Sequence, residues 1–164
     1  MNKAINPHPF FLDQLFAHQG QVTAVFRDIL GLYDIHHIAL SYANHPGQLL
    51  ALSSTPSLEY NLFSKGLWRF DQTYQSGWYQ RCLSSSWGTL YSEQTYNELY
   101  YIKQVKHDLP IGLSFAVKVD SGYVIYSMAS HTNTEETAAI FASEHQSFYN
   151  IGKYCGNLLL PLLM

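Results

Sequence analysis

Charged residues are scarce in this sequence. Asp, Glu, Lys and Arg make up 13% of its 164 residues, well below the roughly 25% usual in soluble domains. The nine Lys and Arg residues do not cluster, whereas proteins that hold DNA or RNA by its phosphates carry a basic stripe. Polybasic runs that attract membrane surfaces are missing as well. The composition therefore argues against nucleic-acid and membrane binding by this chain alone.

Cysteine and long apolar runs are also scarce. The two cysteines, Cys82 and Cys155, are too few for a disulfide framework, so we expect two buried thiols in a reducing compartment. No stretch approaches the about 18 apolar residues of a membrane-spanning helix. The N-terminal segment MNKAINPHPFFLDQLF lacks the apolar core and the small-residue cleavage site of a signal peptide. These absences predict a cytoplasmic protein.

Motifs of catalysis and metal binding are missing too. The sequence contains no Gly-rich phosphate loop, no H-E-x-x-H, no paired C-x-x-C and no G-x-S-x-G. Among eight histidines only His36 and His37 are adjacent, and neighbours in a strand point to opposite faces, so they cannot share one metal ion. We therefore expect no enzyme, no cofactor and no metal site. A Ser or Cys paired with Asp71 or a histidine in a cleft would favour an enzyme instead.

Apolar residues at helical spacing predict six helices. They cover residues 6–16, 22–30, 54–66, 70–79, 93–106 and 133–158. Pro7 in the first turn of the first helix, and Glu135 and Glu136 in the first turn of the last, are typical of helix starts.

Alternating apolar and polar residues predict four strands. They cover residues 37–42, 48–53, 113–119 and 123–128, with a loop expected at 84–88. Two hairpins separated by helices predict a mostly antiparallel sheet with helices on both faces. The fold class is therefore α+β, an α-β-α sandwich, and residues 1–164 are expected to form a single domain.

Aromatic residues, in contrast, are abundant at 15%, and many lie between Tyr60 and Tyr101. Rings fill protein cores, but Tyr and Trp also line ligand cavities because each adds a polar group to an apolar wall. Asp71 lies within this run, between Phe70 and Gln72. A buried carboxylate is costly unless it accepts hydrogen bonds. Asp71 is therefore either an exposed helix N-cap or a buried acceptor for a ligand N–H.

Five segments, at 52–60, 67–71, 87, 109–114 and 126–128, follow one another in a recognisable order. They carry a Pro-led helix with an aromatic residue, an Asp at a helix end, a loop Trp, a Gly that opens a strand, and a strand hydroxyl. This order resembles the N-terminal domain of LuxR-type quorum-sensing regulators, bacterial transcription factors that sense acyl-homoserine lactones. The resemblance runs roughly from Phe10 to Leu160 and depends on order and spacing rather than on close identity.

The resemblance implies a PAS/GAF-like, autoinducer-binding domain. Its ligand-binding residues would be Tyr60, Trp68, Asp71, Trp87, Gly112 and Ser127. In that family a Trp donates to the lactone carbonyl, the Asp accepts the amide N–H, and a Tyr binds the acyl carbonyl. Here Tyr60 stands at the helix Trp position, Ser64 lies one turn on, and Gln72 replaces the Pro that usually follows the Asp.

The resemblance also implies the partners. They would be an apolar acylated small molecule and a second copy of the chain, bound through the long C-terminal helix to form a homodimer. DNA would be contacted only through a helix-turn-helix domain that this chain does not contain, and the apolar segment 157–164 is expected to pack against a partner chain or such a domain. The alternative is a ligand-free module with a closed pocket that dimerises or modulates another regulator. The space between the sheet and the rings around Asp71 distinguishes the two hypotheses.

Overall fold

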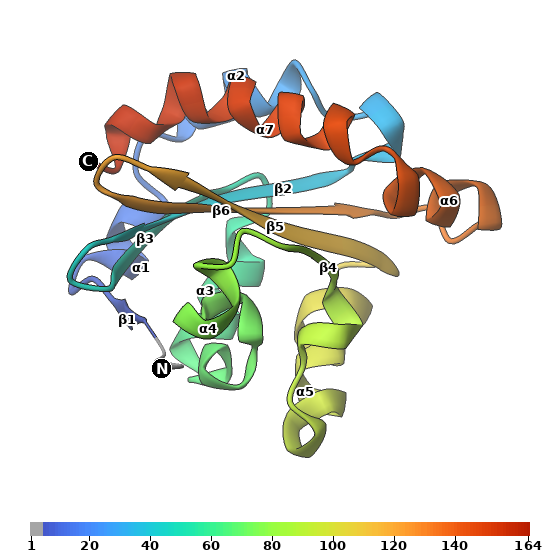
Figure 1. Ribbon diagram of the computed structural model, residues 1–164, viewed down its shortest axis with the longest axis horizontal. Helices are drawn as coiled ribbons and strands as arrows, with labels where there is room; N and C mark the ends of the chain where they lie inside the picture. Colours follow the sequence, from blue (N-terminus) through green and yellow to red (C-terminus); the bar gives the residue numbers. More distant parts are fainter. Residues whose placement is uncertain (1–4) are drawn as a thin grey trace.

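A six-stranded sheet runs through the centre of the described part of the chain, residues 5–164 of a computed structural model (Figure 1). The strands lie in the order β1-β3-β2-β6-β5-β4, with β1 parallel to β3 and all other neighbours antiparallel. Their bounds are Asn6–Pro7 (β1), His37–Asn44 (β2), Gln48–Ser53 (β3), Ser84–Ser86 (β4), Ile111–Val119 (β5) and Gly122–Ser130 (β6). The prediction of a mostly antiparallel sheet is confirmed.

Helices cover both faces of this sheet (Figure 1). The upper face carries α2 (Gln19–Arg27), α6 (Glu135–Ser143) and α7 (His145–Leu159). The lower face carries α1 (Phe11–Leu15), α3 (Pro56–Ser64), α4 (Ser76–Tyr79) and α5 (Tyr96–Tyr100). Short helical turns lie between these elements at Leu32–Asp34, Leu67–Phe70, Gln72–Tyr74, Trp87–Leu90, Glu93–Thr95 and Tyr101–Val105, and one more, Leu160–Leu162, follows α7. The α-β-α layers expected from the sequence are therefore present.

Alternation along the strands sorts side chains between two cores. Large side chains such as Ile38, Leu40 and Tyr126 point up, where they pack with the inward stripe of α7. That stripe consists of Phe148, Ile151, Cys155 and Leu159, which recur at helical spacing. This upper layer is an ordinary apolar interface between sheet and helix.

The lower face of the sheet is lined mainly by small residues. They are Ala39, Ser41 and Ala43 on β2, Gly112, Ser114 and Ala116 on β5, and Ser127 and Ala129 on β6. Small side chains leave space beneath this face of the sheet. Large side chains from the helices and turns below it, among them Trp78, Trp87 and Tyr91, fill that space. Part of the aromatic run noted in the sequence therefore forms the lower core, while Tyr60, Phe70 and Tyr101 of that run are exposed.

Two segment predictions at the sheet edges are wrong. Asn6–Pro7 is strand β1 and not a helix start, because the Asn6 N–H donates to Gly47 O at 2.8 Å and the segment pairs with β3. Ser84–Ser86 is the edge strand β4 and not a loop, since it pairs with Leu113–Phe115 of β5. Both strands are only two or three residues long, too short for a periodic pattern.

Three of the predicted helices are interrupted in the structure. The segment expected as one helix over 133–158 is divided into α6 and α7 by Glu144, whose ψ of 42° leaves the helical region. The segment 93–106 contains α5 between a 3₁₀ turn and the π-helical turn Tyr101–Val105. Residues 70–79 form short 3₁₀ turns and α4.

Candidate functional site

Asp71 lies at the centre of a buried polar cluster under the sheet. It links two 3₁₀ turns, and its Oδ1 accepts a hydrogen bond from the Thr73 N–H at 3.0 Å. Its Oδ2 lies 2.7 Å from the Nζ of Lys103, and none of the Asp71 side chain is exposed to solvent. Asp71 is therefore both a helix cap and a buried acceptor, and its strongest donor comes from the chain itself.

Lys103 is the residue that sequence reasoning missed. It lies in the π-helical turn after α5 and is only 1% exposed. Its Nζ is 4.4 Å from the centre of the Trp87 ring and 5.4 Å from that of Tyr91, so the ammonium makes two cation–π contacts in addition to its contact with Asp71. Its burial could have been inferred only from its position four residues after Leu99, which places it on the buried face of the predicted helix.

Trp87, Gly112 and Ser127 are brought together beside this ion pair. The Trp87 Nε1–H donates to Ser114 Oγ at 3.0 Å, and Ser114 Oγ is 2.8 Å from Ser127 Oγ on the neighbouring strand. Gly112 lies directly against the indole, because a Cβ at this position would overlap the Trp87 ring. The glycine that opens β5 is thus required by Trp87, and the strand hydroxyl of Ser127 is held by Ser114.

Tyr60 and Trp68 lie apart from these groups. Tyr60 is 42% exposed and meets Phe16 edge-on, because the inward positions of α3 are taken by Leu58, Glu59, Leu62 and Phe63. Trp68 is buried and stacks on Phe63 with ring centres 5.7 Å apart. The structure therefore gathers Asp71, Trp87, Gly112 and Ser127, while Tyr60 faces outward and Trp68 belongs to the surrounding core.

A second buried polar pair adjoins the first. His37 Nε2 lies 3.7 Å from Glu59 Oε2, and His37 Nδ1 is 3.0 Å from Thr55 Oγ1. Burial lowers the pKa of His37 to about 3, with the Lys103 charge adding to the effect, and burial raises the pKa of Glu59 to about 7. At neutral pH the imidazole is therefore uncharged. The contact falls within ion-pair distance, but it joins a neutral ring to a carboxyl group that titrates near pH 7.

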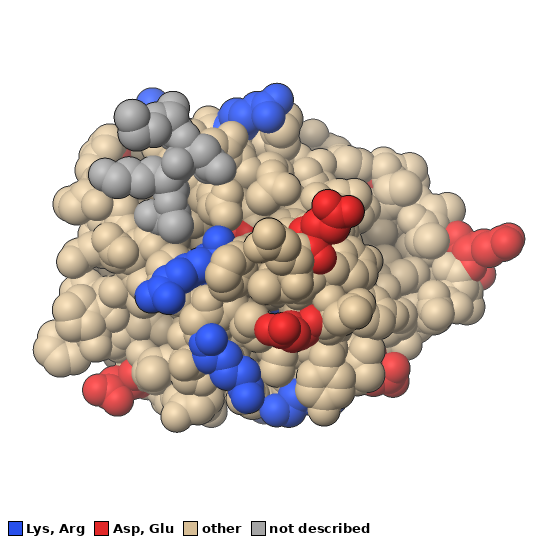
Figure 2. Space-filling model, turned by 90° about the horizontal axis from the view of Figure 1, so that it is seen from below, with Lys and Arg blue, Asp and Glu red and all other residues tan. Residues whose placement is uncertain are grey.

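Metal-binding residue types, thiols and surface charges of the described residues add the following observations. Within residues 5–164, no three His, Cys, Asp or Glu side chains gather as a metal-binding group. Cys82 and Cys155 are free thiols, and Cys82 is exposed, contrary to the expectation that both are buried. None of the helices in the described part of the chain is long and apolar enough to cross a membrane. Figure 2 shows Lys and Arg side chains scattered over the lower surface, without a continuous basic stripe among the described residues.

Comparison with known proteins establishes the fold. The sequence matches no protein-family model and no curated protein. The crystal structure of Escherichia coli SdiA matches 86% of this chain and 61% of the SdiA chain, with 12% identity and a TM-score of 0.59. The LBD domain of VqsR from Pseudomonas aeruginosa matches 90% of each chain, with 16% identity and a TM-score of 0.51. The chain has the fold of LuxR-type autoinducer-binding domains, and it spans about three fifths of the length of SdiA.

Proposed function

We propose that this chain is the signal-sensing domain of a LuxR-type transcription regulator, and that the cluster around Asp71 is the site that responds to the signal. The observation that carries the proposal is the buried carboxylate of Asp71 under a small-residue sheet face, beside Trp87, Gly112 and Ser127. A carboxylate in such a place is retained for a polar contact, because an apolar side chain would pack there at lower cost. The domain acts by binding and not by catalysis.

The signal would be an apolar acylated molecule with an amide N–H, such as an acyl-homoserine lactone. The N–H would replace the Lys103 ammonium at Asp71, and the acyl chain would take up space among the lower-core rings. The free state is then the closed one, with the chain's own lysine in the place of the ligand donor. Opening it costs about 3 kcal/mol if the buried ion pair must separate, which lowers the apparent affinity roughly 150-fold.

Thermal unfolding with a series of acyl-homoserine lactones tests this proposal. A ligand that binds only the folded state stabilises it by about 2.7 kcal/mol at a hundredfold excess over its Kd. We expect the Tm to rise for the wild type and for the control Asp120→Asn, an exposed turn carboxylate, and not for Asp71→Asn. A Tm that stays constant with every lactone, or that rises equally in Asp71→Asn, would refute the proposal.

A second candidate function is a ligand-independent interaction module, favoured by the Lys103–Asp71 contact itself. The ammonium already satisfies the carboxylate, and Asp71, Lys103 and Trp87 are all closed to solvent. Exposed apolar side chains on α7, among them Leu158 at 51%, would then serve a second copy of the chain. Sedimentation equilibrium decides: a dimer that Leu158→Glu dissociates, together with no response to lactones, supports this candidate.

A further inference from the structure

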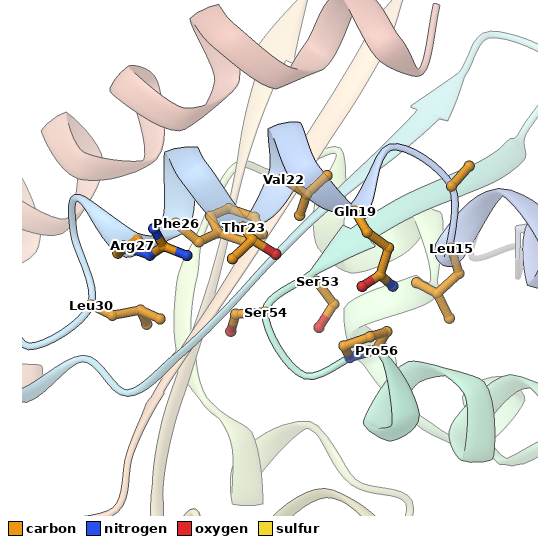
Figure 3. Close-up of a pocket in the computed structure, with 11 residues that line it drawn as sticks. Leu15, Gln19, Val22, Thr23, Phe26, Arg27, Leu30, Ser53, Ser54 and Pro56 are labelled. Carbon is orange, nitrogen blue, oxygen red and sulfur yellow. The ribbon is translucent and has the colours of Figure 1, made fainter.

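One cavity shares no lining residue with the Asp71 cluster, and its lining combines apolar side chains with one arginine. It lies between α2 and the segment that joins β3 to α3, and it encloses about 320 Å³ (Figure 3). From α2, the side chains of Gln19 and Thr23 point toward the segment that carries Ser54 and Pro56, and Arg27 lines the same cavity. The volume is at the lower end of the range for small-molecule sites.

The floor of this cavity is apolar. Leu15, Val22 and Phe26 line it and are all buried in the body of the protein, while Leu30 closes one end with a partly exposed side chain. These four side chains give a short hydrocarbon chain a surface that excludes water on one side. A ligand here would therefore carry an apolar chain.

The charged residue that lines the cavity favours an anion. Arg27 is the one charged residue among those that line the cavity. The charge contacts of the described residues join His37 to Glu59 and Lys103 to Asp71, so Arg27 has no carboxylate partner among them. The adjacent Asp28 turns to α7, where its Oδ2 accepts a hydrogen bond from the Tyr154 hydroxyl at 2.8 Å.

Ser54 supplies a second donor, from the segment that faces α2. Its Oγ accepts the Ile38 N–H at 2.9 Å, and its hydroxyl hydrogen has no acceptor among the described residues. One guanidinium and one hydroxyl match the two oxygens of a single carboxylate, because a guanidinium forms a planar pair of parallel N–H bonds. Arg27 is the one cation of the lining, so a monoanion matches its charge, whereas a phosphate dianion does not.

We propose that this cavity, named here the α2 pocket, binds a small monocarboxylate with a short apolar chain, with the carboxylate on Arg27 and Ser54 and the chain over Val22 and Phe26. The α2 pocket is separate from the Asp71 cluster, and the proposal does not depend on the sensor function. A medium-chain fatty acid is the simplest member of this class of ligand.

Octanoate is the probe for this proposal, with 1-octanol and octylammonium as chain-matched controls. Titration of the isotope-labelled protein followed by NMR should show amide shifts in α2 and in residues 53–56 with octanoate. Octanol should bind at least tenfold more weakly, since it lacks the charge-assisted hydrogen bonds. Equal affinity for octanoate and octylammonium, shifts located elsewhere, or no binding of octanoate would each overturn the proposal.

Matched variants identify the contacts. Arg27→Gln should weaken octanoate binding about tenfold, whereas Arg81→Gln, which removes the same charge from another exposed position, should leave it unchanged. Thr23→Phe should fill the α2 pocket and abolish binding, and Asp120→Asn, at an exposed turn position, should not alter it. Normal amide spectra verify that each variant is folded. Octanoate affinity that is unchanged in both Arg27→Gln and Thr23→Phe would contradict the assignment.

Discussion

Replacing Lys103 with methionine is expected to destabilise the protein by about 3–5 kcal/mol. Methionine has nearly the shape of lysine without the ammonium, so the change leaves the buried Asp71 carboxylate with the Thr73 N–H as its one remaining donor. Removing one member of a buried ion pair has a cost of about this size, because an uncompensated charge remains in the interior. The two cation–π contacts to Trp87 and Tyr91 are lost as well.

A double-mutant cycle measures the interaction directly. Urea unfolding of wild type, Lys103→Met, Asp71→Asn and the double variant gives four free energies of unfolding at one pH. The double variant should lose at least 2 kcal/mol less than the sum of the two single losses, roughly the coupling of a buried charge pair. Lys118→Met, at an exposed position of β5, should change the stability by about 0.5 kcal/mol or less. Additive single losses would refute the reasoning, because they would mean that the two charges do not interact.

Three other substitutions test neighbouring features of the cluster. Gly112→Ala should destabilise by about 1–3 kcal/mol and change the Trp87 fluorescence, because its methyl group would overlap the indole; unchanged stability would show that the ring does not lie there. Ser114→Ala should cost about 1–3 kcal/mol in urea unfolding, since the buried Trp87 N–H loses its acceptor. Glu59→Gln should remove a pH dependence of the stability. Between pH 4.5 and about 7, Glu59 keeps its proton in the folded protein but has lost it in the unfolded chain, because burial raises its pKa, so the free energy of unfolding of the wild type should fall by about 3 kcal/mol relative to the variant as the pH rises through that interval. Parallel curves of unfolding free energy against pH would contradict the assignment.

The long strands could be predicted from sequence because their pattern is local. Residues 37–42 and 123–128 alternate over a full strand length, and both lie within observed strands. The short strands β1 and β4 could not be predicted, because each exists only through pairing with a neighbour that is distant in sequence. The division at Glu144 is likewise a backbone feature that helical spacing on either side does not reveal.

The candidate site could be predicted only in part. Asp71 stands out in the sequence as a carboxylate among aromatic residues. Whether its side chain is exposed or buried depends on its ion pair with Lys103, which is 32 residues away in the sequence. Its spacing from Leu99 places Lys103 on the buried face of the predicted helix, but a lysine on a helix is usually solvated, so the residue type argues against burial. Tyr60 was assigned to the site by its place in the order of segments, whereas the spacing of Leu58, Leu62 and Phe63 determines the buried face of α3 and directs Tyr60 outward.

NMR of the lysine ammonium groups tests the central claim most directly, because it observes the donor that a signal must displace. In the free protein, ¹⁵N-labelled Lys103 should show a slowly exchanging ammonium signal that is absent in Lys103→Met, since it is buried against Asp71. Saturating acyl-homoserine lactone should remove or strongly shift that signal as the ligand N–H replaces the ammonium. A Lys103 signal that is identical with and without every lactone, or one that exchanges with water like that of Lys118, would contradict the account.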